Sequence, residues 1–243
     1  MYNELFNKKI VDLINELDIN EEDNLNKASE LMFNAMKSGL FVHVFATGHS
    51  HMFSEELFYR ACGLVQIDPI LVPILMQHEG AVRSTSLERT RGLAKIIYDG
   101  LDLKPNEPFI IVSNSGINSV PIEMAKICKE NKHPVIVLTS LKTSTNLKSR
   151  VEDGSHLYDY GDVVIDNHAP MGDGVIESKY GKLGSSSTIL NSYIAQKLVL
   201  KIIDLYEANN LTPSIYMSAN LPGGDKHNKE LYEKYKGRIK SLY

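Results

Sequence analysis

Tryptophan is absent from the chain, and cysteine occurs only twice, at Cys62 and Cys128. Both cysteines fall inside helical patterns, and no secretory signal is recognisable, so we expect reduced thiols in a cytoplasmic protein rather than a disulfide. The formal net charge is −4, and no block of Lys or Arg offers a surface to nucleic acid. No apolar run approaches the roughly 20 residues that cross a bilayer. Nucleic acid and membrane are therefore not expected partners.

The composition is that of a globular protein, with 43% apolar and 23% charged residues in 243. This length can bury one large core. We expect a helical hairpin at 1–39 that packs on the core or swaps with it, a ligand-binding core at 40–209, and a C-terminal extension at 210–243 with a terminal helix.

Helix and strand patterns alternate along the core. The runs at 110–112 and 135–138 are continuously apolar, which is typical of parallel strands covered by helices on both faces. We therefore predict an α/β fold with a doubly wound, parallel, five-stranded sheet in a flavodoxin-like three-layer sandwich. The predicted strands are 40–46, 67–75, 109–112, 135–139 and 163–166, and the predicted helices are 2–17, 20–39, 52–63, 85–98, 120–131 and 187–208. A polar stretch at 166–184 is expected to be a loop with a short hairpin near the ligand edge.

Serine-rich loops follow the first and third predicted strands. The first is Thr47-Gly48-His49-Ser50-His51, and the second is Ser113-Asn114-Ser115-Gly116-Ile117-Asn118-Ser119. At the carboxyl end of a parallel strand, such a loop presents hydroxyls and free N–H groups to one point, which suits a phosphate. The alternative is a polar turn that only caps the next helix. The pairing of the loops favours the phosphate site.

These loops, in their strand–loop–helix settings, resemble the sugar isomerase (SIS) domain family of phosphosugar-binding proteins over roughly Asn20 to Tyr206. In that family a Ser-x-Ser-Gly-x-Thr-like loop and an earlier Ser grip the sugar phosphate; here Asn118 stands in place of the usual Thr or Ser. The resemblance implies no cofactor and a homodimer or homotetramer with sites between subunits. It implies a phosphate site formed by Gly48, His49, Ser50, Ser113, Asn114, Ser115 and Asn118.

The resemblance also supplies candidates for proton transfer. The run from Ser50-His51 to Glu55-Glu56-Leu57 looks like that of phosphoheptose isomerases, although it is about one helical turn shorter. It makes Glu55 the expected base, with Glu56 as the alternative. N-acetylmuramic acid 6-phosphate etherases, also SIS proteins, carry a catalytic Glu between the second and third strands, near Glu79 and Glu88.

The segment after the second strand adds His78, which with Glu79 supplies an acid and a base within reach of one ligand. The plainer alternatives are a loop histidine bonded to a backbone carbonyl and, for Glu88, a surface carboxylate at a helix start. His49 and His51 form an H-x-H pair without a third ligand, so we expect no metal. His49 is expected to donate to a ligand oxygen.

Further candidates to line the substrate site lie later in the chain. Asp173 either binds sugar hydroxyls or fixes its turn. The tail motif around Asp225 either reaches over a neighbouring subunit's site or starts a helix, with Asp225 as its cap. The complete set of these candidates is His51, His168, Asp173, Ser187, Asp225 and His227.

The leading hypothesis is therefore an aldose–ketose isomerase of a sugar phosphate, with Glu55 as base and His78 or Glu79 at the carbonyl oxygen. The first alternative is a lyase or etherase that acts on an amino-sugar 6-phosphate with Glu55 and Glu88. The second is a non-catalytic phosphosugar sensor. A sensor of this kind normally carries a DNA-binding domain, and the helical hairpin at 1–39 is too short for one.

Overall fold

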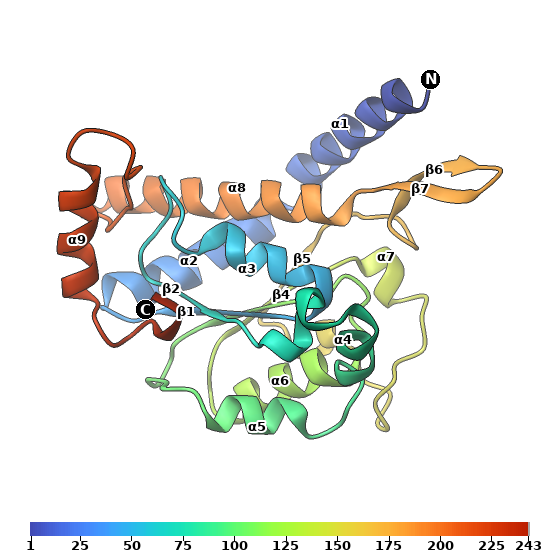
Figure 1. The fold of residues 1–243 in the computed structure, drawn as a ribbon, viewed down its shortest axis with the longest axis horizontal. Coiled ribbons are helices and arrows are strands. Elements are labelled where there is room, and N and C mark those ends of the chain that lie inside the picture. The colour runs from blue at the N-terminus through green and yellow to red at the C-terminus, as the bar shows by residue number, and fades with distance from the viewer. Residues whose placement is uncertain (243) are drawn as a thin grey trace.

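The computed structural model describes residues 1–242 and contains a five-stranded, all-parallel sheet of order β2-β1-β3-β4-β5 (Figure 1). The hydrogen-bonded register aligns Phe45 of β1 with Ile70 of β2 and with Ile111 of β3. The predicted fold class is confirmed. The strands are β1 (Val42–Ala46), β2 (Ile67–Ile70), β3 (Phe109–Val112), β4 (Val135–Thr139) and β5 (Val163–Asp166).

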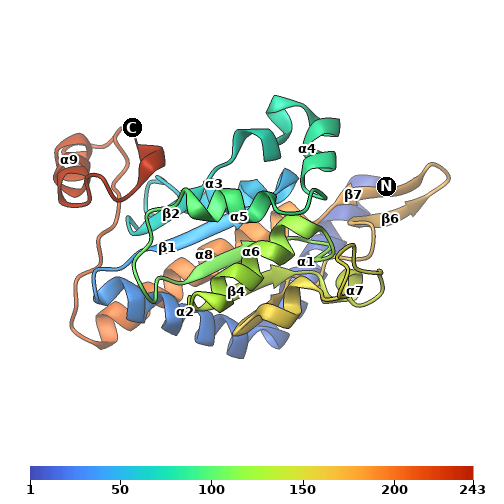
Figure 2. The same cartoon turned by 90° about the horizontal axis from the view of Figure 1, so that it is seen from below.

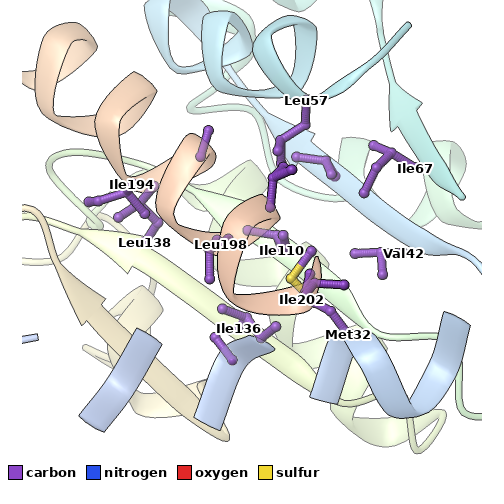
Figure 3. Close-up of a cluster of buried hydrophobic side chains, with 14 of the residues drawn as sticks. Met32, Val42, Leu57, Ile67, Ile110, Ile136, Leu138, Ile194, Leu198 and Ile202 are labelled. Carbon is purple, nitrogen blue, oxygen red and sulfur yellow. The ribbon is translucent and has the colours of Figure 1, made fainter. Parts of the chain in front are cut away.

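Helices cover both faces of the sheet, with α8 on one face and α5 and α6 on the other (Figure 2). Alternate strand residues point to opposite faces. Ile110 and Leu138 pack under α8 (Figure 3). Ile111 and Val137 instead pack with the buried residues of α6 on the other face. Burial on both sides explains the continuous apolar runs of these strands. The covering helices are α2 (Glu22–Lys37), α3 (His51–Leu57) and α8 (Ser187–Ala208) on one face, and α5 (Leu93–Asp99) and α6 (Ser119–Glu130) on the other.

The remaining elements lie around this sandwich. Helix α1 (Tyr2–Asn20) projects beyond the N-terminal end of α8, beside the hairpin of β6 (Gly174–Ser178) and β7 (Gly181–Ser185) (Figure 1). This hairpin confirms the one expected in the 166–184 loop. The short helices are α4 (Ala81–Leu87), α7 (Leu141–Ser144) and α9 (Gly224–Lys234), with 3-10 turns at Gly48–Ser50, Pro73–Leu75, Gln77–Glu79, Leu157–Tyr160 and Lys240–Leu242. None of the helices within 1–242 is long and apolar enough to span a membrane.

Several predicted boundaries are wrong. The helix expected at 85–98 is two helices, α4 and α5, because Gly92 adopts a left-handed φ of 78° between them. The helix expected at 52–63 ends at Leu57, so Cys62 lies outside it and is exposed. The apolar run at 67–75 leaves the sheet after Ile70 and forms a 3-10 turn from Pro73. The charged C-terminal pattern is helical only over α9, and its predicted last residue, Tyr243, lies outside the described residues.

The C-terminal segment is fastened to the amino end of the sheet through a buried carboxylate. Glu107 accepts hydrogen bonds from the Phe41 N–H (3.0 Å), the Lys104 N–H (2.8 Å), His43 Nε2 (3.0 Å) and Arg238 Nη2 (2.6 Å). Burial alone would raise the pKa of Glu107, but hydrogen bonds from these groups lower it to about 2. The Arg238 guanidinium is the link that the tail contributes.

Replacement of Arg238 tests the strength of this link. Arg238→Met should lower the free energy of unfolding by about 3 kcal/mol at neutral pH, because it removes a charged partner from a buried carboxylate. Because the pKa of Glu107 is lowered in the folded state, its ionised form stabilises the fold at pH values above 4.5, the ordinary pKa of a glutamate. This stabilisation is lost as the pH falls towards 2, so the difference in unfolding free energy between Arg238→Met and the wild type should shrink there. Urea unfolding of both proteins at several pH values measures it.

Lys95→Met is the matched control, because Lys95 pairs with Asp99 on the exposed surface of α5. This change should cost less than about 1 kcal/mol. An equal, small loss for both variants would show that the tail contributes no buried ion pair to stability.

Candidate functional site

The predicted Ser-rich loops meet at the carboxyl edge of the sheet, between β1 and β3. After β1 the chain turns to the face of α3, and after β3 it turns to the opposite face, where α6 lies. In open α/β sheets this reversal of strand order leaves a crevice for a ligand. A cavity of about 280 Å³ lies there. Of the predicted site residues it is lined by Gly48, His49, Ser50, Glu88, Ser113, Asn114, Ser115, Asn118, Asp173 and Ser187.

The first loop turns tightly as it leaves β1. Gly48 has a φ of 56°, and the 3-10 turn Gly48–Ser50 leads directly into α3. The Ser50 N–H donates to the Thr47 carbonyl at 3.2 Å, whereas the N–H groups of Gly48 and His49 make no hydrogen bond within residues 1–242. These free donors, with the Ser50 hydroxyl, border the cavity.

The second loop is held from behind by the end of β4 and by α7. Thr139 Oγ1 donates to the Ser113 carbonyl at 2.7 Å, and Ser144 Oγ donates to the Ser115 carbonyl at 2.8 Å. Because these two carbonyls accept hydrogen bonds from β4 and α7, the backbone N–H groups of the loop are left to face the cavity. Those of Asn114 and Ser115, and the Ser115 hydroxyl, make no hydrogen bond within residues 1–242. The loop is thus a cradle of donors, which is what an anion such as phosphate requires.

Gly116 allows this loop to lie so close to its support. Its φ is 63°, and a Cβ at this position would stand 2.4 Å from Ser144 Oγ and 3.1 Å from Thr139 Oγ1. The Gly116 N–H donates to Ser113 Oγ at 3.2 Å, which closes the turn. Any side chain here would push the loop away from β4.

Of the residues predicted to transfer protons, Glu88 lines this cavity. It follows the last residue of α4 and is half-buried, and Thr47 Oγ1 donates to its Oε2 at 2.8 Å. Burial raises the pKa of Glu88, opposed by the Thr47 hydrogen bond and by the nearby charges of Arg89 and Arg150. A carboxyl with a raised pKa can hold a proton nearer neutrality, as an acid–base group must.

Asp173 has a mainly structural place at the cavity wall. It adopts a φ of 66°, and its carboxylate accepts hydrogen bonds from the Ser186 N–H (3.0 Å), the Ser187 N–H (2.7 Å) and the Ser187 hydroxyl (2.9 Å). These contacts cap the start of α8. They favour the fixed turn over sugar binding.

A second cavity, of about 180 Å³, adjoins the first and shares Gly48, His49 and Gln77 with it. Glu55, His51 and His78 line this neighbouring cavity rather than the first. The His51 ring is buried, which lowers its pKa to about 4, and its Nδ1 donates to the Gly48 carbonyl at 3.2 Å. Glu56 instead accepts hydrogen bonds from Gln196 and Arg60.

Other predicted site residues lie outside both cavities. Glu79 is exposed and pairs with Arg83. His168 bonds to Glu21 at 3.2 Å, and this hydrogen bond raises its pKa. Figure 1 shows α9, and with it Asp225 and His227, at the opposite end of the molecule from α4 and the β6–β7 hairpin.

The tail motif has a structural place in this chain. His227 Nε2 donates to the Ile215 carbonyl at 2.8 Å. Asn228 Oδ1 accepts from the Met217 N–H at 2.9 Å, and its Nδ2 donates to the Met217 carbonyl at 2.8 Å. The motif thus starts α9, but the N-cap is Gly223 rather than Asp225, because Gly223 takes the left-handed conformation that turns the chain into the helix.

Sequence reasoning missed several polar residues that complete the first cavity. Thr47 begins the first predicted loop but was not singled out, and the others come from segments whose course along the sheet edge the sequence does not reveal. The run Ser185-Ser186-Ser187-Thr188 at the start of a helix was a usable signal for two of them, Thr188 and Asn191. The missed residues are Thr47, Gln77, Ser84, Thr85, Asn191 and Thr188. Within residues 1–242, no group of His, Cys, Asp or Glu has the arrangement of a metal site.

A doubly wound sheet with a donor-lined cavity at its strand-order reversal is typical of α/β proteins that bind a ligand at this edge. Residues 5–140 match the model of the SIS domain, and the chain belongs to this family. A UPF0309 protein of Geobacillus kaustophilus is 40% identical over 244 residues, which cover 100% of this chain and 97% of that protein. A UPF0309 protein of Listeria monocytogenes serotype 4b is 40% identical over 232 residues, with 95% and 94% covered.

Solved structures share the fold at low identity. A phosphoheptose isomerase from Francisella tularensis superposes with a TM-score of 0.54 at 13% identity, covering 84% of this chain and 96% of that one. The Vibrio vulnificus NanR protein, complexed with ManNAc-6P, superposes with a TM-score of 0.53 at 15% identity, covering 97% of this chain and 69% of that one. These structures confirm the SIS fold, and the fold alone.

Proposed function

We propose that the chain binds a sugar phosphate, with the phosphate in the cavity between the β1 and β3 loops, and interconverts its aldose and ketose forms. The observation that carries the proposal is one cavity that contains both the donor cradle and Glu88. Phosphate needs fixed N–H and O–H donors, and proton transfer needs a carboxyl with a raised pKa. The cavity holds both side by side.

In this proposal Glu88 moves a proton between the two reacting carbons. Ionised Glu88 takes the proton from the carbon next to the carbonyl of the open-chain sugar, and an enediol forms as the carbonyl oxygen gains a proton from water. Glu88 then returns its proton to the former carbonyl carbon, while the neighbouring hydroxyl releases its proton to water and becomes the new carbonyl. Glu55 and His78 line the adjoining cavity, which meets the first at Gly48, His49 and Gln77.

Elimination from an amino-sugar 6-phosphate is the second candidate. It begins with the same proton abstraction, but the bond to a substituent on the next carbon then breaks. The position of Glu88 favours this candidate as well: the resemblance to the etherases implies a catalytic carboxylate near Glu79 or Glu88, and of these two Glu88 lines the cavity.

We also propose a homodimer or homotetramer. Apolar side chains on α1 and at the tip of the β6–β7 hairpin are exposed, including Ile19 at 78% and Tyr180 at 76%. These elements project together from the sandwich, where a second copy can cover them (Figure 1).

A ligand screen followed by turnover in D2O tests the function. A sugar phosphate at 100 times its Kd should stabilise the fold by about 2.7 kcal/mol, seen as a thermal shift. NMR of each hit in D2O should then show deuterium at the carbon next to the carbonyl and either an isomer or an eliminated substituent. If a sugar phosphate binds but neither deuterium exchange nor a product is seen, the proposed enzyme activity is wrong and the chain is a phosphosugar sensor.

Ser115 tests the phosphate cradle. Ser115→Ala should weaken sugar-phosphate binding by about 1–3 kcal/mol, because one donor to a charged oxygen is lost. Ser86→Ala is the matched control: Ser86 is exposed on α4, its hydroxyl donates to the Val82 carbonyl at 3.1 Å, and it does not line the cavity. Calorimetric titration measures both, and equal affinities for the two variants would rule out the cradle.

A further inference from the structure

The side chain of Asn118 has a defined orientation. Asn118 is the N-cap of α6 but makes no side-chain capping bond, and it lines the first cavity with 6% of its surface exposed. Its Oδ1 instead accepts a hydrogen bond from Arg150 Nη1. Because a guanidinium carries only donors, the amide oxygen must be the atom that faces Arg150. The donor end, Nδ2, makes no hydrogen bond within residues 1–242.

This orientation decides whether Asn118 suits an anion. An amide offers an acceptor at one end and donors at the other, and only the donor end attracts a phosphate oxygen. A serine or threonine at this position could rotate its hydroxyl to donate, whereas an asparagine depends on its surroundings to select the correct end. Arg150 makes that selection.

Arg150 is well placed to act through Asn118 rather than on the ligand. Its side chain is exposed and does not belong to the lining of the cavity. Its backbone N–H donates to the Ile117 carbonyl at 3.0 Å, which ties this part of the chain to the phosphate loop. This bond keeps the backbone of Arg150 close to Asn118, within reach of the Arg150 side chain.

We propose that Arg150 is a positioning residue that fixes the Asn118 amide so that Nδ2 donates to the bound phosphate. This proposal rests on the phosphate site of the proposed function. It explains how an asparagine can replace the hydroxyl residue that the family pattern carries at this place in the loop.

A double-mutant cycle tests the proposal, with inorganic phosphate as the probe and calorimetric titration as the measurement. Arg150→Ala should weaken phosphate binding about tenfold, the loss of one hydrogen bond to a charged group. In the Asn118→Ser background the hydroxyl orients itself, so the same change should weaken binding less than about twofold. Arg150→Lys keeps a donor towards Oδ1 and should stay within about threefold of the wild type.

Arg89→Ala is the control for charge alone, because Arg89 is an exposed arginine that, like Arg150, acts on Glu88 through its charge. A loss for Arg150→Ala no larger than that for Arg89→Ala, or an equal loss in the Asn118 and Asn118→Ser backgrounds, would overturn the positioning role. Unchanged thermal melting of each variant confirms that it folds.

A spectroscopic readout separates this proposal from the proposed function. The side-chain amide resonances of Asn118 should shift when phosphate is added to the wild type and not when it is added to Arg150→Ala. If the wild type binds neither phosphate nor any sugar phosphate, the proposed site itself fails. If the wild type binds and Ser115→Ala weakens binding, but the Asn118 amide does not respond, only the role of Arg150 fails.

Discussion

Glu88→Gln should lower the turnover of the sugar phosphate by about 10²- to 10⁴-fold, the contribution of a positioned acid–base group. The glutamine keeps the size of the side chain and an oxygen that can accept from Thr47, so the affinity for the sugar phosphate should change little. Steady-state kinetics and calorimetric titration measure the two effects. Thermal stability should not fall at neutral pH, because the variant removes a charge whose ionisation the fold disfavours.

The wild-type pH profile carries the same signature. The base must be ionised to take a proton, so kcat/KM should rise with pH through the pKa of Glu88. Since burial raises this pKa, the rise should lie above 4.5, the ordinary value of a glutamate. The Glu88→Gln variant should lose this limb of the profile.

Glu79→Gln and Glu55→Gln are the controls that decide which carboxylate acts. Glu79 is exposed, pairs with Arg83 and lies outside both cavities, so its variant should keep wild-type turnover. Glu55 lines the adjoining cavity. If Glu55→Gln abolished turnover while Glu88→Gln kept it, the base would be Glu55 and the assignment to Glu88 would be wrong.

Gly116→Ala should lower the free energy of unfolding by about 2–4 kcal/mol. About 1 kcal/mol comes from a side chain at positive φ, and about 1–3 kcal/mol from overpacking against Ser144 Oγ, 2.4 Å from the new Cβ. Because the loop must move away from β4, phosphate affinity should fall as well. Urea unfolding and calorimetric titration with a sugar phosphate measure these losses.

Gly154→Ala separates backbone strain from the clash. Gly154 has a φ of 74°, but nothing lies within 4 Å of its added Cβ, so the cost should be about 1 kcal/mol with no change in affinity. Adding Ser144→Ala to Gly116→Ala removes the clashing oxygen, and the double variant should be more stable than additivity predicts. Equal costs at both glycines would show that the loop has room to adapt.

The sequence was sufficient where local patterns carry the information. The unbroken apolar runs at 110–112 and 135–138 predicted buried parallel strands, and these strands formed at Phe109–Val112 and Val135–Thr139 as predicted. The Ser-rich loops could be placed because each directly follows such a strand, and carboxyl ends of parallel strands share one edge. Their meeting in one cavity follows from that geometry.

The proposed acid–base residue could not be chosen from the sequence. Glu55, Glu79 and Glu88 are each close to a predicted loop, and nothing local distinguishes them. The segment after β2 runs through successive 3-10 turns and breaks at Gly92, a course that depends on packing over the sheet edge. That course brings Glu88 to Thr47 and leaves Glu79 in solvent.

By itself, then, the sequence determined the parallel sheet and the donor loops at its edge, because strand burial and loop chemistry are encoded in short, contiguous runs. The tertiary structure decided which carboxylate enters the cavity and which arginine faces Asn118. Glu88 reaches Thr47 across 41 positions of sequence, and Arg150 reaches Asn118 across 32. Contacts over such separations depend on how the whole chain packs, and no local pattern records them.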